Sequence, residues 1–198
     1  MKCYVTNNSP YARKVRIVAL EKGLYDDVEW KTITREERGD IQDFNPLGKV
    51  PVASLETGDI VCDSPVICAY LDSLTSSGDL IPESKPKRWP VLTLEALGDG
   101  LGEAVIAVSQ ENQRPNEIRS QSVVDRQTGK IMSALSVLDE AASDFNDPPL
   151  LGEIAVACAL GYMEFRKIVP EWRETFANLE SWYICILKRQ SFTRTAPK

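Results

Sequence analysis

Two Ser-Pro pairs in the first third of the chain provide the groups best suited to holding an anion. Ser9-Pro10 follows an apolar opening segment, and Ser64-Pro65 follows Asp63. Serine is a favoured helix N-cap and proline is favoured in the first turn, where its missing N–H costs nothing, so we expect a helix to begin at each pair. The N-terminus of a helix carries unpaired N–H donors and a partial positive charge. Such sites suit a thiolate or a carboxylate.

The composition limits the classes of function that the chain can serve. Its 198 residues are 43% hydrophobic and 26% charged, which predicts a soluble globular protein of one large or two small domains. The formal net charge of -6 and the lack of a dense basic run argue against nucleic acid as a partner. No apolar stretch reaches the roughly 18 residues of a membrane span, and the first residues have the pattern of a strand rather than of a signal peptide. We expect a cytoplasmic protein with no membrane partner.

The cysteines and the lack of histidine exclude further chemistry. The cysteines are odd in number, scattered and set in apolar runs, so we expect buried small side chains rather than disulfides. The chain has no histidine, which removes imidazole as a general base or metal ligand. Without a Cys-x-x-Cys pair no zinc site can be drawn, and we expect no metal. The five cysteines are Cys3, Cys62, Cys68, Cys158 and Cys185.

Hydrophobic periodicity predicts a βαβαββα order for the first part of the chain, which is that of a thioredoxin-like domain. The polar segment 34–43 is expected to be a loop or a short helix. The predicted strands are 2–6, 28–33, 52–55 and 60–62, and the predicted helices are 10–22 and 65–74.

A change of composition follows, and the rest of the pattern is helical. Three prolines between residues 75 and 90 (Pro82, Pro86 and Pro90) predict a linker, because proline interrupts a helix or a central strand. We therefore expect an α/β domain at 1–76, a linker at 77–89 and an all-helical domain at 90–198. The helices predicted after the linker are 91–110, 116–142, 154–166 and 179–189.

This order of elements and motifs resembles that of the soluble glutathione S-transferases (GSTs), particularly bacterial members with a serine at the active position. The resemblance runs nearly end to end, and several motifs in the right order carry more weight than any one of them. It implies a glutathione-binding first domain, a helical second domain and a homodimer. The motifs are the runs 9–16, 45–51, 63–67, 157–162, 179–183 and 189–192.

The resemblance gives Ser9 the role of donating a hydrogen bond to the glutathione sulfur. A thiol with a pKa of about 8.5 is only a few per cent ionised at neutral pH. A hydrogen bond to a charged group contributes roughly 1.5–3 kcal/mol, so a serine hydroxyl would lower that pKa by about one to two units. Two alternatives remain open: Ser9 serves only as a helix cap, or the amide of Asn7 or Asn8 assists or replaces it.

The remaining glutathione contacts implied by the resemblance come from two further segments. The Val50-Pro51 bond is cis in the family, so that the backbone of Val50 pairs with the cysteinyl part as an added strand does. Lys49 reaches the glycyl carboxylate or extends into solvent. Asp63 binds the γ-glutamyl ammonium, and Ser64 with its helix N–H groups binds the carboxylate beside it. On local sequence alone these residues are also an ordinary turn and an ordinary helix cap.

The pocket for a small hydrophobic electrophile is expected between the domains. Tyr11 and the helix around residues 99–110 are its candidate walls, although the same residues also suit a core or a dimer interface. Three basic residues (Arg13, Lys14 and Arg16) are expected to pair with acids across the dimer or to face solvent.

The function implied is a detoxifying transferase with glutathione as co-substrate and no permanently bound cofactor. The alternatives are a glutathione-dependent peroxidase, dehalogenase or thiol oxidoreductase, and a GST-fold scaffold without activity.

One local feature departs from the family pattern. Relatives begin the helix that holds residues 157–162 with a Ser/Thr-x-x-Asp capping box, in which two side chains satisfy N–H groups of the first turn. Here residues 150–153 run directly into Ile154 without a Ser or Thr at the cap. The loss of a cap costs about 0.5–2 kcal/mol, which a large helical core tolerates.

Overall fold

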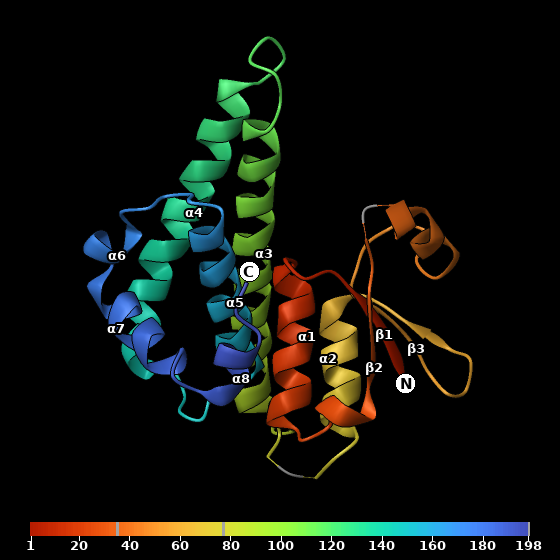
Figure 1. Ribbon diagram of the computed structural model, residues 1–198. Helices are drawn as coiled ribbons and strands as arrows, with labels where there is room; N and C mark the ends of the chain where they lie inside the picture. The colour runs from red at the N-terminus through yellow and green to blue at the C-terminus, as the bar shows by residue number, and fades with distance from the viewer. Residues whose placement is uncertain (35, 77, 198) are drawn as a thin grey trace.

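The computed structural model describes residues 1–34, 36–76 and 78–197 and shows a sheet-containing domain packed beside a helical one (Figure 1). The first domain has the sheet order β2-β1-β3-β4. β1 is parallel to β2 and antiparallel to β3, and β3 is antiparallel to β4. Its elements are β1 (Lys2–Val5), α1 (Pro10–Glu21), β2 (Glu29–Thr32), β3 (Val52–Ser54), β4 (Ile60–Val61) and α2 (Ser64–Ser73).

The predicted fold class is confirmed, with one short helix in place of the uncertain segment. The polar stretch between β2 and β3 forms a 3-10 helix, η2 (Glu36–Asp43), and another, η1 (Tyr25–Asp27), precedes β2. β1 alternates in burial, with Cys3 and Val5 fully buried. Their side chains face the layer of α1 and α2, which lie side by side against the sheet (Figure 1).

The second domain is helical, as predicted, and its longest helix begins earlier than expected. The first helix starts at Lys85 instead of Val91, so Pro86 and Pro90 lie within it. Pro86 is in the first turn, where no backbone N–H is required, and Pro90 removes only one hydrogen bond near the helix start. The helices are α3 (Lys85–Asn112), α4 (Gln121–Ala141), α5 (Leu151–Phe165), α6 (Trp172–Thr175), α7 (Ala177–Ile186) and α8 (Gln190–Arg194), with a 3-10 turn η3 (Ala142–Asp144).

The connection that precedes α3 is held by a buried carboxylate. The side chain of Asp72, at the end of α2, accepts the backbone N–H groups of Leu80 and Ile81, each at 3.0 Å. Lys22 lies 2.9 Å from the same carboxylate. The backbone carbonyl of Leu80 in turn accepts the N–H of Leu151 at 3.0 Å. This part of the predicted linker is therefore anchored to both domains.

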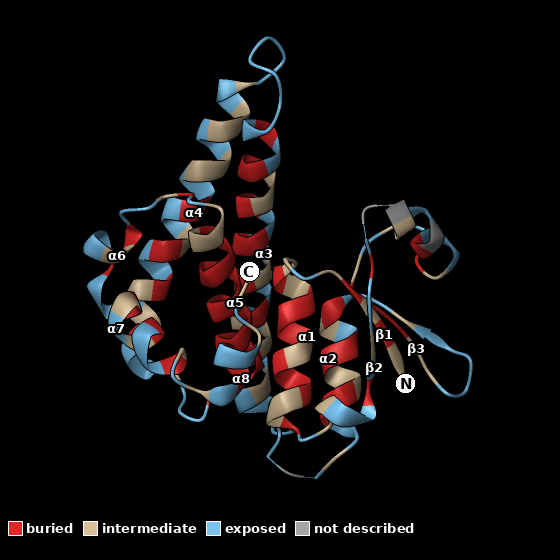
Figure 2. Ribbon diagram, in the orientation of Figure 1, coloured by how far each residue is buried: buried red, intermediate tan, exposed pale blue. Residues whose placement is uncertain are grey.

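The central helix α5 is buried along almost its whole length, as the red ribbon in Figure 2 shows. It packs against α3 at two glycines. A Cβ atom on Gly98 would lie 2.7 Å from the backbone nitrogen of Val156, and one on Gly152 would lie 2.7 Å from the Cβ of Leu94. The two helices therefore approach at a distance that only glycine permits at these positions.

Gly98→Ala is expected to lower the free energy of unfolding by about 1–3 kcal/mol, because the added methyl group meets backbone that cannot move aside. The matched control is Gly100→Ala in the same helix, where the methyl group would have no atom within 4 Å. Alanine is the better helix former by about 1 kcal/mol, so the control is expected to be neutral or stabilising. Urea unfolding measures both; equal effects would contradict the close packing.

The start of α5 explains how the chain does without the family's capping box. Leu150 is the N-cap and has no side-chain acceptor, but Glu153 supplies the other half of the box, because its Oε2 accepts the N–H of Leu150 at 3.0 Å. Its Oε1 accepts the backbone N–H of Asn146 at 3.0 Å and the side-chain amide of Asn146 at 2.6 Å. Glu153 is only 2% exposed. One buried carboxylate thus ties the helix start to the preceding loop.

The cysteine prediction is correct in part. All five thiols are free, and Cys3, Cys68 and Cys158 are buried. The expected burial is wrong for Cys62 and Cys185, which are exposed. Cys62 directly follows the edge strand β4, and Cys185 lies on the outer face of α7. A search of the described helices for one long and apolar enough to cross a membrane finds none.

Candidate functional site

Three of the predicted site segments meet at one end of the sheet because of strand direction. Ser9 follows the C-terminal end of β1, while Val50-Pro51 precedes the start of the antiparallel strand β3, where Tyr4 pairs with Val52. β4 runs antiparallel to β3, so its C-terminal end, and Asp63 after it, also lies there. The N-termini of α1 and α2 consequently lie at the same end as the Val-Pro loop.

Ser9 is the N-cap of α1, as the Ser-Pro pattern predicts. Its backbone is extended and its Oγ accepts the N–H of Ala12 at 3.2 Å. This bond uses a lone pair of the hydroxyl and leaves the hydroxyl proton available. Within the described parts of the chain, this hydroxyl donates no hydrogen bond. Capping the helix and donating to an external anion are therefore compatible, so the two interpretations of Ser9 do not compete.

The start of α2 combines an exposed carboxylate with a buried hydroxyl. Asp63 is the N-cap, and its Oδ1 accepts the N–H of Ser64. Ser64 is 1% exposed, and its Oγ has no hydrogen-bond partner among the described residues. Because a buried hydroxyl is normally paired, the unpaired hydroxyl of Ser64 is an exception at the start of α2.

The Val-Pro loop is positioned by a residue to which the sequence analysis gave no role. The side-chain amide of Asn45 donates to the carbonyl of Lys49 at 3.0 Å, and its Oδ1 accepts the N–H of Leu47 at 3.1 Å. Asn45 is buried, whereas the side chain of Lys49 is exposed. An Asn-Pro pair is a turn signal, and it is the only hint of this role in the sequence.

The peptide geometry of the loop agrees with the expectation. The Val50–Pro51 bond is cis, and so is the bond between Cys62 and Asp63. Within the described residues, neither backbone polar group of Val50 makes a hydrogen bond. The N–H and C=O of Val50 are therefore available to an extended peptide.

Tyr11 lies at the boundary between the domains. Its hydroxyl donates to the backbone carbonyl of Asp99 at 3.2 Å, and its ring packs against Gly102 of α3. Burial, helped by the negative charges of Glu103, Asp99 and Asp63, raises the pKa of Tyr11 well above its ordinary value. Tyr11 is therefore a neutral phenol at physiological pH.

The expectation for the basic residues of α1 is wrong for Lys14, which is fully buried inside this chain. Its Nζ lies 2.9 Å from Glu95 and 2.6 Å from Asp99, both on α3. Burial raises the pKa of Asp99 to about 6, although Lys14 acts in the opposite direction. These contacts join the domains of one chain, so Lys14 is used neither for solvent nor for a dimer contact.

Arg13 is also buried, and it holds the C-terminal segment. Its Nη2 donates to the carbonyl of Phe192 at 3.3 Å and its Nε to Thr195 at 3.4 Å. Its Nη1 has no partner among the described residues and lies against Gly161 of α5. Arg16 is half-buried and lies over the ring of Trp30. The face of α1 that carries Arg13 and Lys14 is thus an interdomain surface.

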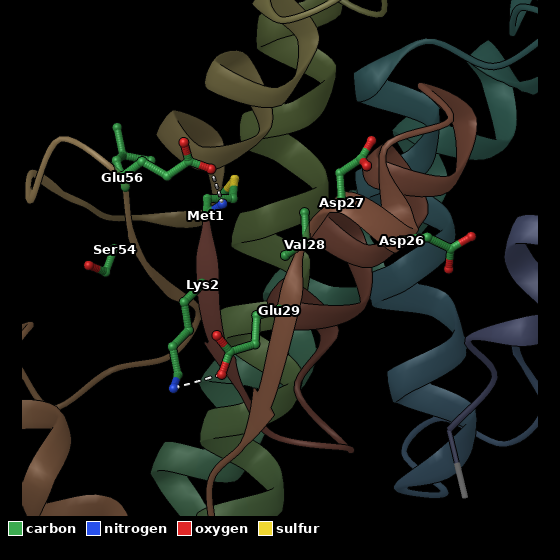
Figure 3. Close-up of a pocket in the computed structure, with 9 residues that line it drawn as sticks. Met1, Lys2, Asp26, Asp27, Val28, Glu29, Ser54 and Glu56 are labelled. Atoms are coloured by element: carbon green, nitrogen blue, oxygen red, sulfur yellow. Dashed lines mark ion pairs between the residues drawn. The ribbon is translucent and has the colours of Figure 1, made fainter.

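A hollow of about 530 Å³ lies at the opposite end of the sheet, where β1 and β2 begin (Figure 3). Lys2 pairs with Glu29 at 2.8 Å and the N-terminal amine with Glu56 at 3.5 Å at its rim. None of the predicted site residues lines it. The chemistry expected from the sequence therefore belongs to the other end of the sheet.

Comparison with known proteins agrees with this arrangement. Residues 8–74 match the family described as "Glutathione S-transferase, N-terminal domain", and residues 121–185 match "Glutathione S-transferase, C-terminal domain". An uncharacterized GST-like protein of Escherichia coli K12, YibF, is 34% identical over 200 residues, which cover 100% of this chain and 98% of that protein.

Solved structures extend the likeness to the whole fold. A glutathione transferase family member from Pseudomonas fluorescens Pf-5 with bound glutathione is 36% identical, with a TM-score of 0.94 over 100% of this chain and 98% of that one. The same family member with S-(propanoic acid)-glutathione gives 0.91 at 36% identity over 100% of both chains. A glutathione S-transferase from Methylobacillus flagellatus KT with glutathione bound is 37% identical, with a TM-score of 0.94 over 100% and 99%. This chain belongs to the glutathione S-transferase family.

Proposed function

We propose that this protein is a glutathione transferase, which binds glutathione at the shared end of β1, β3 and β4 and directs its sulfur to a small electrophile. The observation that carries the proposal is the convergence there of two helix N-termini with unsatisfied polar groups. Ser9 has a free hydroxyl proton, and Ser64 has a buried hydroxyl without a partner. The glutathione complexes of the relatives support the choice of ligand.

Each part of glutathione then meets a group of suitable chemistry. Ser9 donates to the sulfur, and the free backbone groups of Val50 beside Pro51 pair with the cysteinyl residue. Asp63 binds the γ-glutamyl ammonium while Ser64 binds the neighbouring carboxylate, and the exposed Lys49 reaches the glycyl carboxylate. Apart from the backbone pairing of Val50, these contacts are charge-assisted, and charge-assisted hydrogen bonds are the stronger kind.

The proposed chemical step needs no group beyond the two substrates. The thiol proton is lost to solvent, and the thiolate sulfur attacks an electrophilic carbon. A sulfur–carbon bond forms, and the bond to the leaving group breaks with its electron pair. Holding the two reactants together and stabilising the thiolate are the protein's contributions. The S-substituted glutathione held by the Pseudomonas fluorescens relative is a thioether of the kind that this step produces.

A thiol–disulfide exchange reaction through Cys3, the cysteine on the opening strand, is disfavoured. Cys3 is fully buried, and burial raises the pKa of its thiol to about 12. A thiol that is neutral and inaccessible is a poor nucleophile. The transferase reaction, in which the reacting sulfur belongs to glutathione, fits the site better.

The proposal is tested by measuring glutathione binding calorimetrically and conjugation with a panel of electrophiles that includes 1-chloro-2,4-dinitrobenzene. Binding together with turnover is the expected result. Binding without turnover of any electrophile would favour a scaffold protein. No heat of binding at millimolar glutathione would overturn the proposed ligand itself.

We also propose that the protein is a homodimer. Several large apolar side chains of the first domain and of the start of α3 are exposed, including Ile60 (41%), Val66 (51%) and Trp89 (61%). Where such side chains form a contiguous patch, the patch marks a site of protein–protein contact. Sedimentation at micromolar concentration is expected to give twice the chain mass of 22.1 kDa. The double variant Val66→Asp and Trp89→Asp is expected to sediment as a monomer; unchanged dimer mass would place the interface elsewhere.

A further inference from the structure

The last turn of α5 carries an arginine that is built into a fixed position without a carboxylate partner. Arg166 is the C-cap residue of α5, and its Nε donates to the hydroxyl of Tyr162 at 3.0 Å. Its guanidinium carbon lies 5.1 Å from the centre of the Tyr162 ring and 5.0 Å from that of Phe165. Among the described residues no acid forms an ion pair with Arg166. The neighbouring Glu164 pairs with Arg173 instead.

The packing of α5 on α3 shows where Arg166 lies along the helical domain relative to Tyr11. Gly152 lies against Leu94 and Gly98 against Val156, so the two helices run in the same direction and in register. Tyr11 packs against Gly102, one turn further along α3. The final turn of α5 therefore lies further towards the C-terminal ends of α3 and α5 than Tyr11 does. Tyr162, to which Arg166 is bonded, is also near enough to Tyr11 to affect its pKa.

The residues around Tyr11 are mostly acidic, so an arginine without an ion-pair partner is the cation available to a negatively charged substrate there. Three acidic residues act on Tyr11: Asp63, Asp99 and Glu103. In the proposed complex Asp63 holds the glutathione ammonium, and Asp99 is already paired with Lys14. A substrate anion in this neighbourhood therefore needs a cation of its own. In the described structure, Nη1 and Nη2 of Arg166 make no hydrogen bond. The two parallel N–H groups of a guanidinium can bind both oxygens of a carboxylate.

We infer that Arg166 binds a carboxylate of the electrophilic co-substrate, so that the protein prefers organic acids that carry an electrophilic carbon at the far end from the carboxylate. This inference rests on the proposed transferase function and gives its substrate class. The carboxylate is not consumed: the sulfur–carbon bond forms and the leaving group departs elsewhere in the same molecule. Tyr162 and Phe165 act as positioning residues, because they hold the guanidinium in one orientation.

The test uses two electrophiles that differ only in charge, 4-chloro-3-nitrobenzoate and 4-chloro-3-nitrobenzamide. The ratio of their kcat/KM values, corrected for the uncatalysed rates, is measured for the wild type, Arg166→Gln, Arg166→Lys and the control Arg119→Gln. Arg119 is exposed on the α3–α4 connection, so its variant changes the net charge equally. Arg166→Gln is expected to lower the ratio by about ten- to a hundredfold, the effect of one charge-assisted hydrogen bond.

The other variants separate recognition from folding and from overall charge. Arg166→Lys keeps the charge but loses the fork and is expected to lie between wild type and Arg166→Gln, whereas Arg119→Gln is expected to leave the ratio unchanged. Equal loss with both electrophiles in Arg166→Gln would mean that the residue only caps α5, and the inference would be overturned. An unchanged ratio would overturn it as well.

Binding measurements keep the inference separate from the proposed function. The synthetic glutathione thioethers of the same benzoate and benzamide are titrated into wild type and Arg166→Gln in a calorimeter. A preference for the acid that the variant loses supports the role of Arg166 even if the wild type turns over neither electrophile, which would contradict only the transferase reaction. Equal affinities for the acid and the amide in the wild type would overturn the role of Arg166 while leaving the transferase proposal intact.

Discussion

Ser9→Ala is expected to lower the rate of glutathione conjugation at pH 7 by about tenfold or more. In the proposed mechanism the hydroxyl donates to the thiolate. A hydrogen bond to a charged group contributes roughly 1.5–3 kcal/mol, which corresponds to about one to two pKa units of the bound thiol. Without it, the thiol returns towards a pKa of about 8.5 and only a few per cent is ionised at pH 7. Ultraviolet absorbance of the bound thiolate as a function of pH measures this pKa directly.

The pH dependence distinguishes this role from a structural one. Above a pH of about 9 the thiol ionises without assistance, so the rates of variant and wild type are expected to converge there. Alanine also removes the cap on Ala12, which costs about 0.5–2 kcal/mol of stability, whereas glycine in a cap position costs only a few tenths. Ser9→Gly therefore isolates the lost hydrogen bond, and a Ser9→Gly enzyme with wild-type rates at pH 7 would refute the mechanism.

Asn8 provides the comparison for the alternative donor. Its side-chain oxygen is buried without a hydrogen-bond partner in the described structure. If an asparagine amide activates the sulfur instead of Ser9, Asn8→Ala lowers the rate at pH 7 and Ser9→Gly does not. We expect the reverse, because Ser9 caps the helix whose N-terminus faces the same site and still has a proton to donate.

The two helix starts at the candidate site were predictable from sequence because their signals are local. A Ser-Pro pair marks the start of a helix whatever the rest of the chain does, and both pairs start helices here. The order and pairing of the strands, which the structure shows, bring the three segments to one end. The cap at Glu153 is equally local, three residues after Leu150, but it lacks the serine or threonine that identifies a capping box in a sequence.

The interdomain network was not predictable because its partners are distant in sequence. Lys14 and its acids, Glu95 and Asp99, are separated by 81 and 85 residues. A basic residue on a short helix is usually exposed, and only the packing of α1 on α3 and α5 shows otherwise. The start of α3 at Lys85 differs from the predicted start for another reason: a proline in the first turn of a helix has the same local pattern as one in a linker.

Lys14→Met is expected to destabilise the protein by about 3–5 kcal/mol at pH 8, because it leaves two carboxylates, Glu95 and Asp99, facing each other without a cation in a buried position. Methionine keeps the length of the side chain, so the loss is mainly one of charge. Urea unfolding of the variant and of the wild type measures the difference.

A neutral background tests whether the loss arises from the stranded charges. In the double variant Glu95→Gln and Asp99→Asn, adding Lys14→Met is expected to cost far less, since no carboxylate remains to be stranded. An equal loss of unfolding free energy in both backgrounds would mean that Lys14 stabilises the interface through the packing of its aliphatic chain and not through its charge.

The pH gives an independent check through Asp99. Its pKa is raised in the folded protein from 3.8 to about 6, so its contribution to stability is fully favourable below pH 3.8 and is lost as the pH rises through about 6. Removing Lys14 takes away the cation that opposes this shift, and the pKa of Asp99 must then rise further. The destabilisation caused by Lys14→Met is therefore expected to be smaller at pH 5, where Asp99 binds a proton, than at pH 8. A destabilisation that is the same at both pH values would show that Asp99 stays ionised without its partner, and that the interdomain contact does not depend on this charge.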